Sequence, residues 1–295
     1  MPVIRADRPP GKMLRGLARR TLSAAMKDLK TAAADGGVHG VRKRLKFMRS
    51  LLRLVRYSIG RRDFGSADRK LRKAADGLAG ARRAEALRET VSKLQAEISL
   101  PKNALAELGA AIARAHDQYA TGQSMRDAMP KAMRNMASVH RAVSRWPLAN
   151  RSIDPLVKGL KMSYGRARRK LAEGLSSGEI AILHEARKSV IHHLHQLEIL
   201  QPLSPGMIEA RTRELPILRE ALGDLNDLDE LEAVIAQENV TAFSSIAEQD
   251  SVTAAIAARR KVLMDLVRER SDHLFSEQPK AFANRIGSMW KEKPD

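Results

Sequence analysis

Hydrophobic residues recur along nearly the whole chain at the three- and four-residue spacing of amphipathic helices. No window alternates between apolar and polar residues with the period of two that a half-buried strand shows. Glycine, proline, aspartate and asparagine interrupt the pattern where turns are expected. The pattern predicts helices over residues 11–34, 38–60, 66–79, 82–98, 102–120, 123–146, 156–174, 179–200, 206–222, 225–238, 250–275 and 279–291. It therefore predicts an all-α protein without a sheet.

A break over residues 147–155 (PLANRSIDP) divides the predicted helices into two groups. Short links between helices favour antiparallel neighbours and hence bundles. One motif recurs on both sides of the break, because HGVRK at 39–43 and HEARK at 184–188 share the pattern H-x-x-R-K. Each copy opens a long helix in its half. The sequence therefore predicts two related halves, residues 1–150 and 151–295, that together form one domain.

The composition limits the possible classes of protein. Hydrophobic residues make up 43% of the chain and aromatic residues only 3%, so we expect a core of Leu, Ile, Val, Met and Ala. Cysteine is absent, which excludes disulfides, thiolate zinc sites and a thiol nucleophile. No apolar run reaches the length of about 18 residues that a membrane helix needs. We therefore expect a cytoplasmic protein that does not enter a membrane.

Positive charge is both large and unevenly distributed. The formal net charge is +19, and residues 1–62 hold 17 Lys or Arg against three acids. Residues 158–170 hold six Lys or Arg and no acid, whereas residues 220–250 hold nine acids and no Lys or Arg. Segregated charge attracts a ligand of the opposite sign. The partners that this charge suggests are therefore nucleic acid, polyphosphate or an anionic membrane surface, and polyphosphate is the favoured one.

Residues 38–59 carry a dense positive charge on one helical face. On a helical wheel, the cations fall within an arc of roughly 120° around His39. They are Arg42, Lys43, Lys46, Arg49 and Arg53. One apolar arc beside them holds Val41, Leu45, Met48, Leu52 and Val55, and another holds Phe47, Leu51 and Leu54. Packing on two sides predicts that the basic face lines a groove; a solvated surface face is the alternative. No acid between residues 36 and 62 offsets the repulsion, so a polyanion would relieve it.

The second copy of the motif is less basic. Its shared face carries His184, Arg187, Lys188 and His195. Ile191 and Leu194 stand where the first copy has Lys46 and Arg49, so we expect weaker binding there. The HHLH run at 192–195 would need a further ligand to hold a metal ion, and no matching motif is evident. We therefore expect neither a metal nor another cofactor.

Two further basic stripes occur at helical spacing. One consists of Lys12, Arg15 and Arg19. The other consists of Lys161, Tyr164 and Arg168, with Arg169 and Lys170 beside them. Each stripe alone is typical of a solvated face. Together with the His39 helix, they would enclose a polyphosphate chain from several sides.

Four stretches resemble, in order, the signatures of the CHAD family, an all-helical domain named for its histidines. They are VHGVRKRLKFMRSLLRLVR at 38–56, GLKMSYGRARRKL at 159–171, LHEARKSVIHHLHQLEIL at 183–200 and LPILREALGDLNDL at 215–228. The resemblance spans almost the whole chain. It implies two related antiparallel helical bundles that face each other across a basic cleft. It also implies binding of inorganic polyphosphate and, in some members, association with polyphosphate granules.

The resemblance also implies which side chains contact polyphosphate. Carried over to this chain, they are His39, Arg42, Lys43, Lys46, Arg49, Arg53, Tyr164, Arg168, His184, Arg187 and Lys188. The basic stripes and the second motif helix add Arg15, Arg19, Lys161, Arg169 and His195. Ile191 and Leu194 depart from positions that are often basic or polar in the family, which weakens the expected contribution of the second half.

Two other functions are weighed against polyphosphate binding. A nucleic-acid binder is disfavoured because aromatic residues for base stacking are scarce and no helix-turn-helix or zinc-finger signature occurs, although weak non-specific binding of nucleic acid fits a basic groove. A polyphosphate-processing enzyme is disfavoured because the chain has no P-loop and no paired acidic metal motif, so no catalytic residue is assigned. Asp224 and Asp227 are expected to cap helices and shape turns.

Overall fold

The computed structural model describes residues 9–35, 38–78, 83–97, 109–110, 112, 122–148, 152–201, 205–237 and 246–291. All regular secondary structure in these ranges is helical, which confirms the all-α prediction. The predicted helix over 102–120 lies almost wholly outside the described residues. No helix in the described ranges combines the length and the apolar character needed to cross a bilayer.

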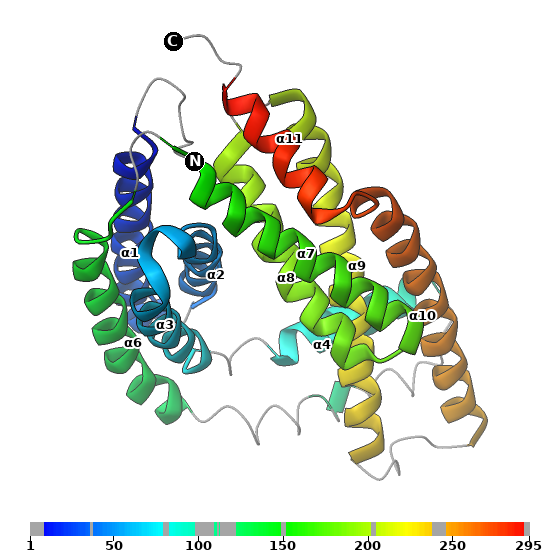
Figure 1. Ribbon diagram of the computed structural model, residues 1–295. Coiled ribbons are helices and arrows are strands. Elements are labelled where there is room, and N and C mark those ends of the chain that lie inside the picture. Colours follow the sequence, from blue (N-terminus) through cyan, green and yellow to red (C-terminus); the bar gives the residue numbers. More distant parts are fainter. Residues whose placement is uncertain are drawn as a thin grey trace.

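Two groups of helices lie side by side (Figure 1). The first group comprises α1 (Pro10–Asp35), α2 (His39–Leu54), α3 (Arg56–Asp76) and α6 (Gly122–Val143). The second comprises α7 (Asp154–Ser177), α8 (Ile180–Leu200), α9 (Pro205–Gln237), α10 (Ile246–Leu274) and α11 (Pro279–Lys291). The groups meet where α2 packs against α7 and α8 and where α3 packs against α7. The two motif helices, α2 and α8, are therefore direct neighbours.

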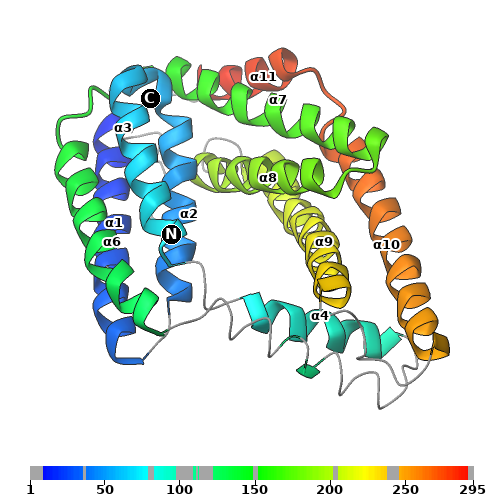
Figure 2. The ribbon, with the colours of Figure 1, turned by 90° about the horizontal axis from the view of Figure 1, so that it is seen from below.

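The helix α4 (Arg83–Glu97) comes from the predicted first half but lies on the second group. It packs against α9 and α10, as Figure 2 shows. Its buried residues Leu87 and Leu94 belong to the common hydrophobic core, and Lys93 pairs with Asp224 of α9 at 2.9 Å. The division into residues 1–150 and 151–295 stays a prediction, and α4 crosses it.

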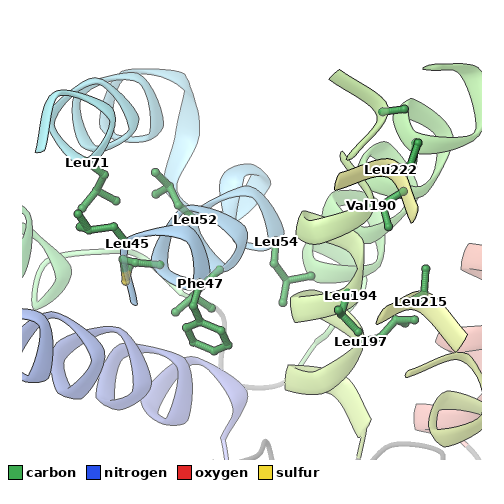
Figure 3. Close-up of a cluster of buried hydrophobic side chains, with 14 of the residues drawn as sticks. Leu45, Phe47, Leu52, Leu54, Leu71, Val190, Leu194, Leu197, Leu215 and Leu222 are labelled. Carbon is green, nitrogen blue, oxygen red and sulfur yellow. The ribbon is translucent and has the colours of Figure 1, made fainter. Parts of the chain in front are cut away.

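The core consists mainly of leucine and other aliphatic side chains, as the composition predicted. All eight residues of the two predicted apolar arcs of α2 are buried. In Figure 3, Leu45 and Leu52 of α2 lie near Leu71 of α3, whereas Leu54 points toward the second group. Val190, Leu194 and Leu197 of α8 are buried in the same core. Leu194, which departs from the basic pattern of the first copy, is thus part of the packing between helices.

Several predicted helix boundaries differ from the structure, most clearly those on either side of two predicted breaks. The basic helix ends at Leu54, and α3 begins at Arg56 after a turn at Val55. Gly60 breaks α3 internally with φ of 79°, a conformation that glycine adopts without the steric cost of a Cβ atom. The predicted helices 206–222 and 225–238 form one continuous helix, α9. The sequence Gly223-Asp224 suggested a turn, but partners on other helices engage these residues within α9.

A close contact between backbones fixes α7 against the end of α2. A Cβ atom placed on Gly159 of α7 would overlap the carbonyl group of Leu54. Glycine therefore allows the two helix backbones to touch at this point. Because Leu54 is the last residue of α2, the contact sets where the basic helix ends relative to the second group.

Candidate functional site

The basic face of α2 lies at the junction of the two helix groups. His39, Lys43 and Lys46 are exposed, and Arg49 and Arg53 are half-buried. Successive cations stand one turn apart because α2 is helical from His39 to Leu54. The described side chains therefore present a row of positive charge along one face, as the helical wheel predicted.

Arg42, the remaining cation of the predicted row, is tied to the end of α3. Its guanidinium NH1 donates to the carbonyl of Leu78 at 2.9 Å. A carbonyl beyond the last helical turn lacks an intrahelical donor, so Arg42 supplies one. Arg42 thus connects α2 to α3 as well as adding positive charge to the row.

Acids from neighbouring helices offset part of the charge of α2. Arg49 Nε and Arg53 NH1 both lie 3.1 Å from the same oxygen, Oδ1 of Asp68 in α3. Arg44, which lies off the basic row, pairs with Asp28 of α1 at 2.6 Å. The expectation that a polyanion would relieve the repulsion did not include these ion pairs. It considered acids close in sequence, whereas Asp28 and Asp68 approach α2 through the packing of α1 and α3.

A serine joins α2 to α8 where the two helices cross. Ser50 Oγ lies 2.8 Å from Nδ1 of His192 and 3.0 Å from Nδ1 of His195. The hydroxyl also donates to the carbonyl of Lys46 at 2.9 Å. Its single proton is thus used within α2, and its two lone pairs accept the Nδ1–H groups of both imidazoles. The hydroxyl is fully satisfied in a buried position.

Gln196 extends the crossing to α7. Its Nε2 donates to the carbonyl of Ser50 at 3.2 Å and to Oγ of Ser163 at 2.9 Å. One buried amide therefore bridges α2, α7 and α8. The amide nitrogen makes both of these bonds, whereas the buried Oε1 has no hydrogen-bond partner among the described residues. The two donated bonds favour one relative arrangement of the three helices.

The two imidazoles at the crossing are held neutral. Burial, followed by the charges of Arg53 and Arg49, lowers the pKa of His192 well below its ordinary value. Burial, followed by the charges of Arg219, Lys46 and Lys43, lowers the pKa of His195 to about 4. Neutral imidazoles can lie beside these lysines and arginines without adding further positive charge. His195, predicted as a ligand contact, lies half-buried against the ring of Phe47, with centroids 5.4 Å apart.

Two cations near the crossing were missed by the sequence reasoning. Arg166 of α7 lies close enough to lower the pKa of Arg53, after burial and the charge of Arg49, and it pairs with Glu185 at 3.6 Å. Arg219 of α9 acts on His195 and on Glu198 of α8. Arg166 stands within the acid-free segment 158–170, which was the available signal. Arg219 reaches the crossing because α9 packs against α8, and no local sequence pattern indicates this packing.

The second H-x-x-R-K copy engages its own neighbours. Arg187 Nε donates to the carbonyl of Arg219 at 3.4 Å, and its guanidinium lies against Gly223, where a Cβ atom would stand 2.6 Å from NH2. Lys188 pairs with Glu185 at 2.6 Å. Burial lowers the pKa of half-buried His184, and the charges of Lys188 and Arg187 lower it further. This copy therefore forms part of the contact between α8 and α9.

The structure places Tyr164 and Arg168 in the packing of α7 against the segment before α11. Tyr164 is fully buried, stacks on Phe282 at 4.3 Å and donates its hydroxyl to the carbonyl of Glu277 at 3.1 Å. Arg168 Nε donates to the carbonyl of Phe275 at 3.0 Å. Both predicted ligand contacts thus serve the core, and Tyr164 cannot reach a ligand from its buried position.

The stripe on α1 is turned toward α6. Arg15 NH1 donates to the carbonyls of Trp146 and Leu148, at 3.1 and 3.4 Å. Arg19 is exposed, and its charge, after burial, lowers the pKa of His140 in α6. The expected enclosure of a ligand between this stripe and the row on α2 stays a prediction. On α7, Lys161 and Arg169 are exposed.

The HHLH run separates into two environments. His193 is completely buried among Tyr164, Phe275 and Phe282, and burial, followed by the charge of Arg211, lowers its pKa to about 3. His192 and His195 share Ser50 instead. Within the described residues, no group of three or more His, Cys, Asp or Glu side chains is arranged to hold a metal ion.

Asp224 connects three helices. Its Oδ1 pairs with Lys93 of α4 at 2.9 Å, and its Oδ2 lies 3.9 Å from NH2 of Arg259 in α10. Burial raises the pKa of the neighbouring Asp227. The structural role predicted for Asp224 fits these contacts, but Asp224 acts between helices from the middle of α9 and not as a cap or turn. Asp227 also lies within α9, and its carboxylate accepts from the side chain of Asn226.

Comparison with known proteins gives one match. The family model for the CHAD domain matches residues 13–236, which run from α1 to the last turn of α9 and include α2, α7 and α8. No curated protein matches the chain.

Proposed function

The chain belongs to the CHAD domain family, which is known for polyphosphate binding, and from this premise we propose that it binds inorganic polyphosphate through the basic face of α2. The observation that carries the proposal is the row of cations at the junction of the helix groups. Its members are Lys43, Lys46, Arg49 and Arg53, with Arg42 at its edge and the His39 side chain at its start. In this proposal the protein binds polyphosphate without cleaving its phosphoanhydride bonds.

The chemistry of the row suits a linear polyanion. Lysine ammonium groups act as mobile point charges, whereas guanidinium groups donate paired hydrogen bonds to phosphoryl oxygens. Successive cations along a helix face stand about 5–6 Å apart, so the row offers a series of contact points along a linear polyanion. Release of the counterions that accompany the ligand adds a driving force that falls with salt.

The other predicted contacts are assigned different parts in this proposal. Lys161, Arg169 and Arg19 are exposed and raise the positive potential around the protein, which speeds the approach of an anion. The side chains that hold helices together lie outside the proposed contact row. They are Arg15, Tyr164, Arg168, His184, Arg187 and His195. Lys188 is exposed, pairs with Glu185 of its own helix and also lies outside the row.

Calorimetric titration of the pure protein with long-chain polyphosphate and, separately, with duplex DNA at about 0.15 M salt tests the proposal. We expect tight binding of polyphosphate and binding of DNA that is at least about tenfold weaker. Equal or tighter DNA binding would make the protein a general nucleic-acid binder. Release of phosphate from polyphosphate by the pure protein would contradict binding without reaction.

We extend the proposal to association with polyphosphate granules in the cytoplasm. A fluorescent fusion of the chain should gather at granules in cells that store polyphosphate. The same fusion carrying Lys43→Ala and Lys46→Ala should spread through the cell, because the two exposed lysines belong to the proposed row. Equal association of both fusions with granules would refute this extension, whereas the proposal that the protein binds polyphosphate would be unaffected.

A further inference from the structure

Arg49 and Arg53 share one carboxylate that approaches from outside their own helix. Asp68 of α3 places its Oδ1 at 3.1 Å from both Nε of Arg49 and NH1 of Arg53. The three side chains are exposed to similar degrees, 23% for Arg49, 22% for Arg53 and 21% for Asp68. The cluster is therefore neither sealed in the core nor fully solvated, and a ligand can reach it.

The cluster retains unused capacity for anions. Two guanidinium groups carry two positive charges, and Asp68 supplies one negative charge. Each guanidinium has five N–H donors, of which Asp68 engages one on each arginine. Arg166 of α7 adds a further positive charge nearby, since it contributes to the lowered pKa of His192 at the crossing. The cations thus exceed the local carboxylate.

The Asp68 carboxylate is negatively charged when it lies between the two arginines, as a bound anion would be. Burial alone would raise the pKa of Asp68, but the charges and hydrogen bonds of Arg53 and Arg49 lower it overall, so this carboxylate is ionised at neutral pH. An internal polyphosphate unit presents two non-bridging oxygens that share one negative charge, whereas the carboxylate presents the same single oxygen to both arginines. Each arginine would then bond its own oxygen.

We propose that Asp68 is an internal substitute for ligand phosphate, which occupies the Arg49–Arg53 pair in the free protein and is displaced from it when the polyanion binds. The inference rests on the proposed function and deepens it, because it makes Asp68 the residue that sets how tightly that site binds. In the free protein, Asp68 keeps two half-buried cations from repelling each other; in the complex, a phosphoryl group takes over that role.

A second ion pair of α2 provides a matched control. Asp28 of α1 pairs with Nε of Arg44 at 2.6 Å, as Asp68 pairs with Nε of Arg49, but Arg44 lies off the basic row. Asp68→Asn and Asp28→Asn remove the same charge and keep the same side-chain size. Only the first variant removes a competitor of the ligand.

The test is titration of polyphosphate into the wild type, Asp68→Asn and Asp28→Asn over a range of salt concentrations. Asp68→Asn should bind about threefold to tenfold tighter. Its plot of log affinity against log salt should be steeper by about one released ion. Asp28→Asn should match the wild type. Unchanged or weaker binding by folded Asp68→Asn, with normal binding by the wild type, would overturn the inference and leave the proposed function standing.

A measurement on the wild type covers the case in which Asp68→Asn does not fold. The arginine Nε–H resonances are followed by NMR while polyphosphate is added. The Arg49 signal should move as its carboxylate partner is exchanged for phosphate, and the Arg44 signal should stay. A stationary Arg49 signal in a saturated complex would overturn the inference. Absence of any polyphosphate binding by the wild type would instead refute the proposed function.

Discussion

Oγ of Ser50 and Nδ1 of His192 lie 2.8 Å apart, and they belong to the two helices that carry the repeated H-x-x-R-K motif. The helices that carry the two copies of the motif therefore pack against each other. The first copy presents exposed cations beside this contact, while the second copy supplies neutral imidazoles to it. In the proposed function, the first copy faces the ligand, and the helix of the second copy supports the helix of the first.

Removing two exposed lysines of the row should weaken ligand binding without unfolding the protein. Lys43→Ala with Lys46→Ala should reduce polyphosphate affinity about tenfold, because two charge contacts are lost at no cost in buried area. The slope of log affinity against log salt should fall by about 1.4. The control is Lys27→Ala with Lys30→Ala on α1, an exposed pair at the same spacing. Equal losses in both double variants would mean that net charge alone governs binding.

A methyl group at Gly159 should disturb the junction between the helix groups. Gly159→Ala places a Cβ atom on the carbonyl of Leu54, and we expect it to lower the free energy of unfolding by about 3 kcal/mol. Gly206→Ala is the control, since no atom lies within 4 Å of its added Cβ. Urea unfolding followed by circular dichroism measures both. A loss below about 0.5 kcal/mol for Gly159→Ala would show that the two helices do not approach this closely.

The histidines of α8 should make the protein sensitive to mild acid. His195 has a folded pKa of about 4 and His193 of about 3, whereas an unfolded histidine titrates near its ordinary value of 6.5. Below pH 6.5 these histidines are therefore protonated in the unfolded chain while they remain neutral in the folded protein. The free energy of unfolding should fall as the pH decreases, by about 1.4 kcal/mol per pH unit for each such histidine.

Urea titrations at several pH values between 7 and 4.5 check this dependence. His195→Asn keeps a donor near Ser50 but does not titrate, so its plot of unfolding free energy against pH should be shallower by one proton. Above pH 6.5 the wild type should show no contribution from His195. A slope that is the same in the wild type and in His195→Asn would show that this imidazole is already accessible to protons in the folded protein.

The second motif copy should matter for stability more than for ligand binding. Arg187→Ala removes a guanidinium that lies against Gly223 and donates to the carbonyl of Arg219, so the free energy of unfolding should fall by about 1–2 kcal/mol. Polyphosphate affinity should stay within about twofold of the wild type. This is the reverse of the pattern expected for the lysine pair on α2. A tenfold loss of affinity with unchanged stability would place Arg187 on the ligand.

Helical periodicity was sufficient to predict the faces of α2. Residues three and four apart share a side of any helix, so Leu45 and Leu52 had to be buried together and Lys43 and Lys46 exposed together. The order of the sequence motifs likewise indicated the family that the comparison found. Both depend on short-range regularities that a single sequence contains.

The partners of that face depend on how helices are rotated against each other, which the sequence pattern does not specify. Asp68 meets Arg49 only because α3 turns back after Val55 and packs along α2. Tyr164 looked like a ligand contact because it stands in register with basic residues, yet its ring completes an aromatic cluster. A polar tip on a large ring is compatible with either position, and packing decides between them.

The location of α4 has a consequence for how the chain is made. A ribosome that has released α4 has not yet synthesised α9, which begins at Pro205, or α10 after it. Leu87 and Leu94 must therefore wait for partners from a later part of the chain. Expression of residues 1–150 alone would leave this apolar surface uncovered, and expression of residues 151–295 alone would leave Asp224 without Lys93. The packing of α4 can therefore be completed only after α9 and α10 have been synthesised.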